Sequence, residues 1–304
     1  MRPLAAIDIG SNTVHLLVGT PDAHGEVKHH LSESVLLELG REVEKHGKIR
    51  EKKLRRLRKV LRHQVWRARK LGARQVLVAA TGAVRRAENG EEVRREIERS
   101  SGVEVKILTA PAEARLAFLG SAPALHPKEL QVLIDSGGAS TEVTLTRGRR
   151  IVTSTSMGIG ASLLCADLEH DPPGPLEWAR LSLRIAEGLR RLPPGPRPQR
   201  GLAVGGAAHR LEELNGKGPG APVELDDLER IAGRLLRHSS KRIARASGVP
   251  RKKVMLLAAG ALIIHAIMCH YGLEAVDVGH QGLRDGMITA YRRVSGNWWR
   301  PEDS

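Results

Sequence analysis

The sequence predicts an α/β fold made of two related domains. Three observations support this. The chain of 304 residues exceeds the roughly 100 to 200 residues of an ordinary domain. One order of strands and helices occurs twice, and each copy opens with a strand that ends in aspartate and a glycine turn. We therefore expect an N-terminal domain of residues 1–122 and a C-terminal domain of residues 123–304, facing one cleft.

The first copy begins with three β-rich runs separated by turn residues: Leu4–Gly10, Thr13–Gly19 and Val27–Ser34. Apolar residues at three- and four-residue spacing from Leu54 to Leu71 predict an amphipathic helix that ends at Gly72. The remaining expected elements are a strand, a helix, a strand and a helix: Gln75–Ala80, Glu91–Ser100, Val103–Leu108 and a helix beginning at Pro111.

The second copy repeats the three-strand meander, and the boundary between the copies falls near Gly120 to Pro127. Its expected strands and helices, in order, are Leu130–Ile134, Thr141–Arg147, Arg150–Ser156, a helix over Trp178–Leu192, the strand Leu202–Val204, helices over Asp226–Ala246 and Val254–Tyr271, the strand Ala275–Val278 and a helix over Leu283–Arg293. A ligand is expected where the strand ends and their turns converge.

Composition narrows the classes of function. Hydrophobic residues make up 41% and charged residues 27% of the chain, as in globular proteins. The most apolar stretch, Val254 to Met268, contains His265 and reads as a buried helix, so no membrane partner is expected. The first residues lack the features of a signal peptide, and the two cysteines fit a reducing compartment, so a cytoplasmic location is expected.

The net charge of +15 favours a polyanionic partner. Of the seven Phe, Trp and Tyr residues, only Trp66 lies in the most basic segment. Proteins that bind single strands usually interleave stacking aromatic residues with cations, which makes nucleic acid the less favoured partner.

Both strand-end turns have the composition of a phosphate site. They read Asp8-Ile-Gly-Ser-Asn-Thr and Asp135-Ser-Gly-Gly-Ala-Ser-Thr-Glu142. Glycines allow close approach of the backbone, and successive amides and hydroxyls can hold phosphate oxygens. Asp8 and Asp135 supply the hard oxygen atoms that Mg²⁺ prefers. An isolated Asp-x-Gly is commonly only a tight turn, but its repetition favours a site. The predicted phosphate-binding residues are Gly10, Ser11, Asn12, Thr13, Gly137, Gly138, Ala139, Ser140 and Thr141.

A series of motifs resembles the exopolyphosphatase and guanosine pentaphosphate phosphatase (Ppx/GppA) family over nearly the whole chain. The motifs are IDIGSNTVHLLV at 7–18, ATGAVRRAENG at 80–90, EARLAFLG at 113–120 and DSGGASTEV at 135–143, with weaker matches at HDPPGP, AVGG and GLRDG. The resemblance implies two actin-like (ribonuclease H-like) domains. It also implies a phosphoanhydride hydrolase, an exopolyphosphatase, that uses Mg²⁺ (or Mn²⁺).

By the same resemblance, Glu113 would be the catalytic glutamate that activates water, and Arg85 would offset charge on the transferring phosphate. Arg86 is the less favoured candidate for that role. Glu142 would join Asp8 and Asp135 at the metal. Each has a plainer interpretation: Glu113 as a first-turn helix acid, Arg85 as a surface arginine and Glu142 as an exposed strand charge.

The chain departs from the family pattern at several small residues. Ala112 stands where a second acid is usual, Ala207 where a threonine is common and Ala161 near the place of an arginine. Ser136 and Ala139 also differ from the usual turn. The chain ends without the helical C-terminal domain of long members, so it resembles the short two-domain type.

The segment Arg50–Lys70 contains eleven Lys or Arg and one acid. One interpretation is a track for the distal part of a polyphosphate chain, formed by Arg55, Arg58, Lys59 and Arg62. The other is a solvated helix face.

The sequence is compatible with four functions. The first is hydrolysis of the terminal phosphate of inorganic polyphosphate, and the second is the 5′-phosphohydrolase reaction on guanosine pentaphosphate (pppGpp). A kinase of the same superfamily is less favoured, because Ala207 lacks the hydroxyl of the common Gly-Gly-Thr segment. A non-catalytic polyphosphate-binding regulator is also less favoured, because Glu113, Asp135 and Glu142 occur together. A homodimer is left open.

Overall fold

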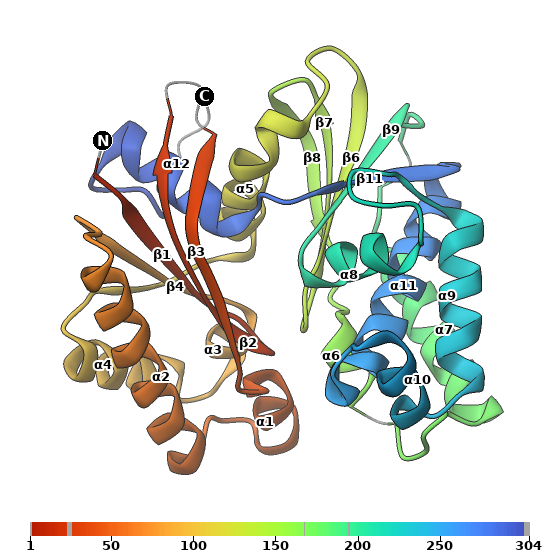
Figure 1. Ribbon diagram of the computed structural model, residues 1–304, viewed down its shortest axis with the longest axis horizontal. Coiled ribbons are helices and arrows are strands. Elements are labelled where there is room, and N and C mark those ends of the chain that lie inside the picture. Colours follow the sequence, from red (N-terminus) through yellow and green to blue (C-terminus); the bar gives the residue numbers. More distant parts are fainter. Residues whose placement is uncertain (1, 23–25, 167, 194, 301–304) are drawn as a thin grey trace. The chain divides into compact units, whose positions relative to one another are not determined.

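The computed structural model describes residues 2–22, 26–166, 168–193 and 195–300 (Figure 1). The chain forms two compact units. The first holds the chain up to Pro123 together with the segment from Gln281 onward, and the second holds Ala124–His280.

The first unit contains a five-stranded sheet in the order β3-β2-β1-β4-β5. Its strands are β1 (Leu4–Ile9), β2 (Thr13–Pro21), β3 (Val27–Leu36), β4 (Val76–Ala80) and β5 (Val105–Ile107). The first three strands are antiparallel, whereas β1, β4 and β5 are parallel, with Ile9 beside Ala80 and Ala80 beside Ile107. The carboxyl ends of these three strands therefore lie along one edge of the sheet.

Helices cover both faces of this sheet. They are α1 (Leu39–His46), α2 (Glu51–Lys70), α3 (Gly82–Arg86), α4 (Gly90–Ser101), α5 (Ala110–Ser121) and α12 (Leu283–Val294). Side chains alternate between the faces of a strand. Accordingly, Ile7 and Ile9 pack in the core with α1 to α4, and Leu4 and Ala6 pack in a second core with α5 and α12.

The last helix belongs to the first unit, which corrects the expected C-terminal domain of residues 123–304. Figure 1 shows α12, in blue, beside the red strands β1 and β2. Two glycines allow its close contact with α5: a Cβ added at Gly120 would lie 2.0 Å from the carbonyl oxygen of Gly282, and one at Gly286 would lie 1.7 Å from that of Leu116. The His29 ring also lies 2.6 Å from the buried Asp285 carboxylate. The sequence order of the two copies did not reveal this return.

The second unit contains a six-stranded sheet in the order β10-β11-β9-β6-β7-β8. The strands are β6 (Leu130–Ser136), β7 (Thr141–Arg147), β8 (Arg150–Ser156), β9 (Arg200–Val204), β10 (Val223–Glu224) and β11 (Ala275–Gly279). Strands β6, β9 and β11 are parallel, with Val204 beside both Asp135 and Gly279. Each unit thus combines an antiparallel meander with parallel strands and helices, and the prediction of actin-like α/β domains is confirmed.

The helices of the second unit are α6 (Ala161–Leu164), α7 (Pro175–Leu189), α8 (Gly206–Leu214), α9 (Leu225–Arg237), α10 (Ser240–Ser247) and α11 (Arg251–Tyr271). The single helix expected over Asp226–Ala246 was wrong. Ser239 interrupts it and caps α10 by accepting a hydrogen bond from the Arg242 amide. The Asp171 carboxylate accepts two further hydrogen bonds from Ser240, which holds the new helix start in place.

Helix α11 is the one helix of the described residues that is long and apolar enough to cross a membrane, over Lys253–Tyr271. Most of that stretch is buried inside the second unit, where Val254, Ile264 and Met268 join the main core. The burial agrees with the buried helix that the sequence predicts.

Candidate active site

The turn between β1 and β2 is the first part of the candidate site. The Gly10 amide donates to the Thr13 carbonyl at 3.0 Å and closes the turn, and both Asp8 carboxylate oxygens lie within 4.0 Å of the position that a Gly10 Cβ would occupy. The carbonyls of Ser11 and Asn12 accept hydrogen bonds from the segment that leads into α1. Because the two groups of a trans peptide point in opposite directions, the amides of Asn12 and Thr13 face away from that segment.

Arg85 and Glu113 meet at the same edge of the first sheet. Arg85 lies on α3, directly after β4, and Glu113 lies in the first turn of α5, after β5. Their side chains form an ion pair with 2.8 Å between Nη1 and Oε2, and the same Nη1 donates to the Leu108 carbonyl at 2.7 Å. The side chains are only 25% and 14% exposed, so the pair is largely shielded from bulk water.

The local sequence explains why Glu113 lies in the first turn of α5. Thr109 caps α5 by accepting a hydrogen bond from the Ala112 amide, and Pro111 lies in the first turn. Asp8 lies on the same face of β1 as Ala6, which is the face that α5 covers. The β1 end and the start of α5 therefore approach one region of the first unit.

The surroundings of Glu113 alter its acidity. Burial raises the pKa of the Glu113 carboxyl above its ordinary value, while Arg85 and Arg86 oppose that rise. Burial lowers the pKa of Arg86, and neighbouring Arg85 acts in the same direction. A carboxylate with a raised pKa is a stronger base, which suits proton abstraction from water.

The turn between β6 and β7 has the same closing bond as the first turn, because the Gly137 amide donates to the Ser140 carbonyl at 3.0 Å. Asp135 and Glu142 are directly opposite each other in the strand pair and so project from one face. An Asp135 oxygen lies 3.3 Å from the position of a Cβ on Gly205, and Ser156 donates to Glu142 at 3.2 Å.

Thr141 differs from the rest of this turn. Together with Ser136 it lies on the opposite face, which carries the core residues Ile134 and Val143. Thr141 is fully buried, and its hydroxyl finds no hydrogen-bond partner among the described residues. The structure thus separates the Thr141 side chain from the carboxylates, although both belong to one motif.

Gly160 packs against the second turn, a contact that was not predicted from the sequence. A Cβ at this residue would lie 2.6 Å from the amide nitrogens of Ala139 and Ser140, so no larger residue fits without a shift. The first amides of α6 donate to the carbonyls of Gly137 and Gly138. The amides of Gly138 and Ala139 consequently face away from α6. Gly160, the second glycine of SMGIGASLL, was the sequence feature that could have indicated this contact.

Two departures from the family pattern have structural explanations. The Ala207 Cβ would lie 2.7 Å from a Cβ on Gly260, so residue 207 packs toward α11. Ala161 is buried in the main core of the second unit. The HDPPGP segment also has a structural role, because the Glu177 carboxylate accepts backbone hydrogen bonds from Glu169, His170 and Gly174. These bonds lower the pKa of Glu177 to about 2.

The expected metal ligands come from both units. Asp8 belongs to the first unit, whereas Asp135 and Glu142 form a pair in the second. Among the described residues, no three His, Cys, Asp or Glu side chains gather into a metal-binding group. The Asp135 and Glu142 pair still offers carboxylate oxygens on one face, which are suitable donors for Mg²⁺.

Comparisons with known proteins agree with this architecture. The chain is 28% identical to Exopolyphosphatase 1 of Mycobacterium tuberculosis, over 94% of this chain and 87% of the relative, and 26% identical to its Mycobacterium leprae counterpart, over 94% and 88%. A crystal structure of the Aquifex aeolicus Ppx/GppA family member superposes with a TM-score of 0.81, at 24% identity over 97% of this chain and 99% of that one. An exopolyphosphatase from Cytophaga hutchinsonii gives a TM-score of 0.84, at 22% identity over 97% and 98%. The Ppx/GppA phosphatase family matches residues 22–292. The chain therefore belongs to the Ppx/GppA phosphatase family.

Proposed function

We propose that this protein is an exopolyphosphatase that hydrolyses the terminal phosphate of inorganic polyphosphate with the help of Mg²⁺. The observation that supports this most directly is the Arg85–Glu113 pair at the carboxyl edge of β1, β4 and β5. The curated relatives named exopolyphosphatase and the net charge of +15 favour polyphosphate as the substrate.

Glu113 is the base in this mechanism. Its carboxylate takes a proton from a water molecule as the water oxygen bonds to the terminal phosphorus. The bond from that phosphorus to the bridging oxygen breaks, and the bridging oxygen leaves with its electron pair on the shortened chain. The products are orthophosphate and a polyphosphate one unit shorter. The raised pKa of Glu113 increases its basicity for this step.

Arg85 has two tasks. Its Nη1 holds Glu113 and the Leu108 carbonyl. A guanidinium has five N–H donors, so Nε and Nη2 remain to contact phosphate oxygens. Arg85 can thus keep the base in place and still offset the charge that develops during transfer.

Each turn would hold phosphate oxygens. In each turn the carbonyls accept hydrogen bonds from a neighbouring segment, which directs amides such as those of Asn12 and Gly138 the opposite way, where they can donate to phosphate. Asp135 and Glu142, which project from one face of the β6–β7 pair, would hold Mg²⁺, and the bound ion would neutralise phosphate charge.

The test is phosphate release from long polyphosphate, tripolyphosphate and pppGpp, measured side by side with Mg²⁺. We expect the largest kcat/KM for long polyphosphate. Faster hydrolysis of pppGpp would assign the alternative 5′-phosphohydrolase function. If the protein releases phosphate from none of the three substrates, the proposal is contradicted.

A further inference from the structure

The exposed cations of α2 form a stripe that is interrupted at the exposed Trp66. They recur every three or four residues up to Arg62 and again after Trp66, and are Lys52, Arg55, Arg56, Lys59, Arg62, Arg69 and Lys70. At 1.5 Å per residue the stripe is about 27 Å long. Its beginning lies near the β1–β2 turn, because Lys53 donates to the Leu37 carbonyl and the Leu37 amide donates to the Asn12 carbonyl.

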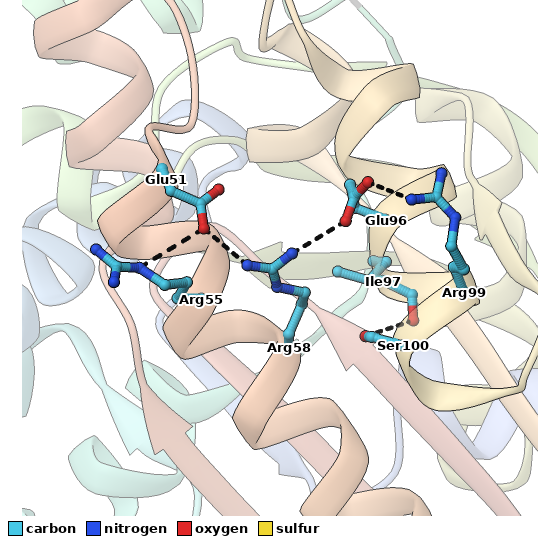
Figure 2. Close-up of polar contacts among 7 residues, drawn as sticks. All are labelled: Glu51, Arg55, Arg58, Glu96, Ile97, Arg99 and Ser100. Atoms are coloured by element: carbon cyan, nitrogen blue, oxygen red, sulfur yellow. Dashed lines mark hydrogen bonds and ion pairs between the residues drawn. The ribbon is translucent and has the colours of Figure 1, made fainter.

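Two members of the predicted polyphosphate track are already engaged. Figure 2 shows the Glu51 carboxylate between Arg55 and Arg58, and the Glu96 carboxylate between Arg58 and Arg99. Arg58 is 26% exposed and joins α2 to α4. Its role is therefore structural. The cations of the stripe outside this network, and so available to a ligand, are Lys52, Arg56, Lys59, Arg62, Arg69 and Lys70.

The stripe ends at a cavity of about 260 Å³ beside the first residues of β4 and β5. This is the edge of the sheet opposite to Glu113. The polar and aromatic residues that line the cavity are Arg69, Arg74, Gln75, Glu104, Lys106 and Trp298. Within the described ranges, neither Arg69 nor Arg74 has a carboxylate within 4.0 Å, so both guanidinium groups can donate hydrogen bonds to an anionic ligand.

Lys106 is fixed in this cavity by two neighbours. Its ammonium lies 3.7 Å from the centre of the Trp299 ring, in a cation–π contact, and it pairs with the exposed Glu104. Glu104 offsets one positive charge, which leaves the two arginines as the net charge of the cavity. Unpaired arginines with planar donor groups are suited to phosphate oxygens.

The size of the cavity limits what can enter. Pockets for whole drug-sized ligands measure about 300 to 1,000 Å³. A volume of 260 Å³ instead suits one or two phosphate groups of a longer chain that continues along α2.

We propose that this cavity is a non-catalytic anchoring site for phosphate groups of a polyphosphate chain, with Arg69 and Arg74 as its principal ligands. The proposal rests on the proposed polyphosphate substrate and adds a second place where the chain is held. Only long chains can occupy the α2 stripe and the cavity together, so the site would favour them over short substrates.

The test uses fluorescently labelled long polyphosphate and the Glu113→Gln background, in which turnover does not interfere with binding. The double variant Arg69→Gln/Arg74→Gln should weaken binding about tenfold at low salt and reduce the slope of log affinity against log salt by about 1.5. In the otherwise native protein, the same pair of changes should leave the kcat/KM for tripolyphosphate unchanged.

A matched control removes the same charge elsewhere. Arg242 and Arg245 are exposed residues of α10 in the second unit, and Arg242→Gln/Arg245→Gln should leave long-chain affinity within about twofold, because neither residue lines the cavity or belongs to α2. Equal loss in both double variants, or no loss in the first, would overturn the anchoring site. Tighter binding of a single-stranded RNA oligomer than of polyphosphate at the same salt would also overturn it.

These outcomes separate the two proposals. If the wild-type protein releases no phosphate from polyphosphate but binding depends on Arg69 and Arg74, the proposed function fails and the anchoring site is supported. If it hydrolyses polyphosphate and the double variant binds normally, only the anchoring site fails.

Discussion

The two strand-end turns share one local design but stand in different chemical surroundings. Gly10 and Gly137 each close a turn with a bond of 3.0 Å, and each turn follows an aspartate. Beyond β4, the first unit supplies Arg85, which meets Glu113. At the corresponding place after β9, the second unit has Gly205 and Gly206 instead. The repeated fold therefore provides two candidate places for phosphate, whereas the proposed base and its arginine occur in the first unit.

Removing the base should give the largest effect and would test whether the first unit alone supplies it. Glu113→Gln keeps the shape of the side chain but removes its basicity, so kcat should fall about 100- to 10,000-fold. Phosphate release at saturating substrate measures this. Glu92→Gln, at an exposed first-turn acid of α4, is the matched control and should retain the wild-type rate. A Glu113→Gln rate above about a third of wild type would remove Glu113 from this role.

Removing the arginine should give the next largest effect. Arg85→Met should lower kcat about 100-fold, because the transferring phosphate loses a positioned donor and Glu113 loses its partner. Arg95→Met, at an exposed arginine of α4, tests the loss of one positive charge alone. Equal rates for the two variants would show that Arg85 acts only through net charge.

The second turn should affect the metal rather than the base. Asp135→Asn and Glu142→Gln replace anionic oxygen ligands by amides, so we expect the Mg²⁺ concentration for half-maximal rate to rise about tenfold or more. High Mg²⁺ should restore part of the rate. Unchanged Mg²⁺ titrations in both variants would locate the metal away from this pair.

Replacing Gly160, which packs against the second turn, should give the smallest effect, and the effect should be on stability. Gly160→Ala must displace the turn backbone, and we expect a loss of about 1 to 3 kcal/mol in the free energy of unfolding. Gly296→Ala is the control, because a Cβ there meets no atom within 4 Å. Denaturant unfolding measures the free energy of unfolding of both variants. A Gly160→Ala protein as stable as wild type would show that the turn backbone shifts at little cost.

The parts that could be predicted from the sequence were those with local signals. The apolar stripe of α2 and the two Asp-Gly turns are visible in periodicity and composition, and α2 ends within two residues of the expected Gly72. The short helices α3 and α8 were missed, because helices of five and nine residues carry too little periodicity. The break between α9 and α10 depends on Asp171, which is distant in sequence.

Other features depend on contacts between remote segments. The return of α12 to the first unit requires Gly120 and Gly286 to meet, and no local pattern reveals that they do. Resemblance to the family indicated roles for Glu113 and Arg85, but their direct contact and the raised pKa of Glu113 arise only from the folded chain. The gathering of Trp298 and Trp299 beside basic residues of the first unit was equally hidden.

The central claim is that Glu113 is the base and that Arg85 adjusts its acidity. The pH dependence of kcat/KM tests it most directly, in wild type and in Arg85→Met. Because the base must be deprotonated, the rate should fall as the pH drops through the pKa of Glu113, which burial raises above the ordinary value of about 4.3. Arg85 lowers that pKa, so its removal should move the acid limb to higher pH. An acid limb at the same pH in both proteins would contradict the account.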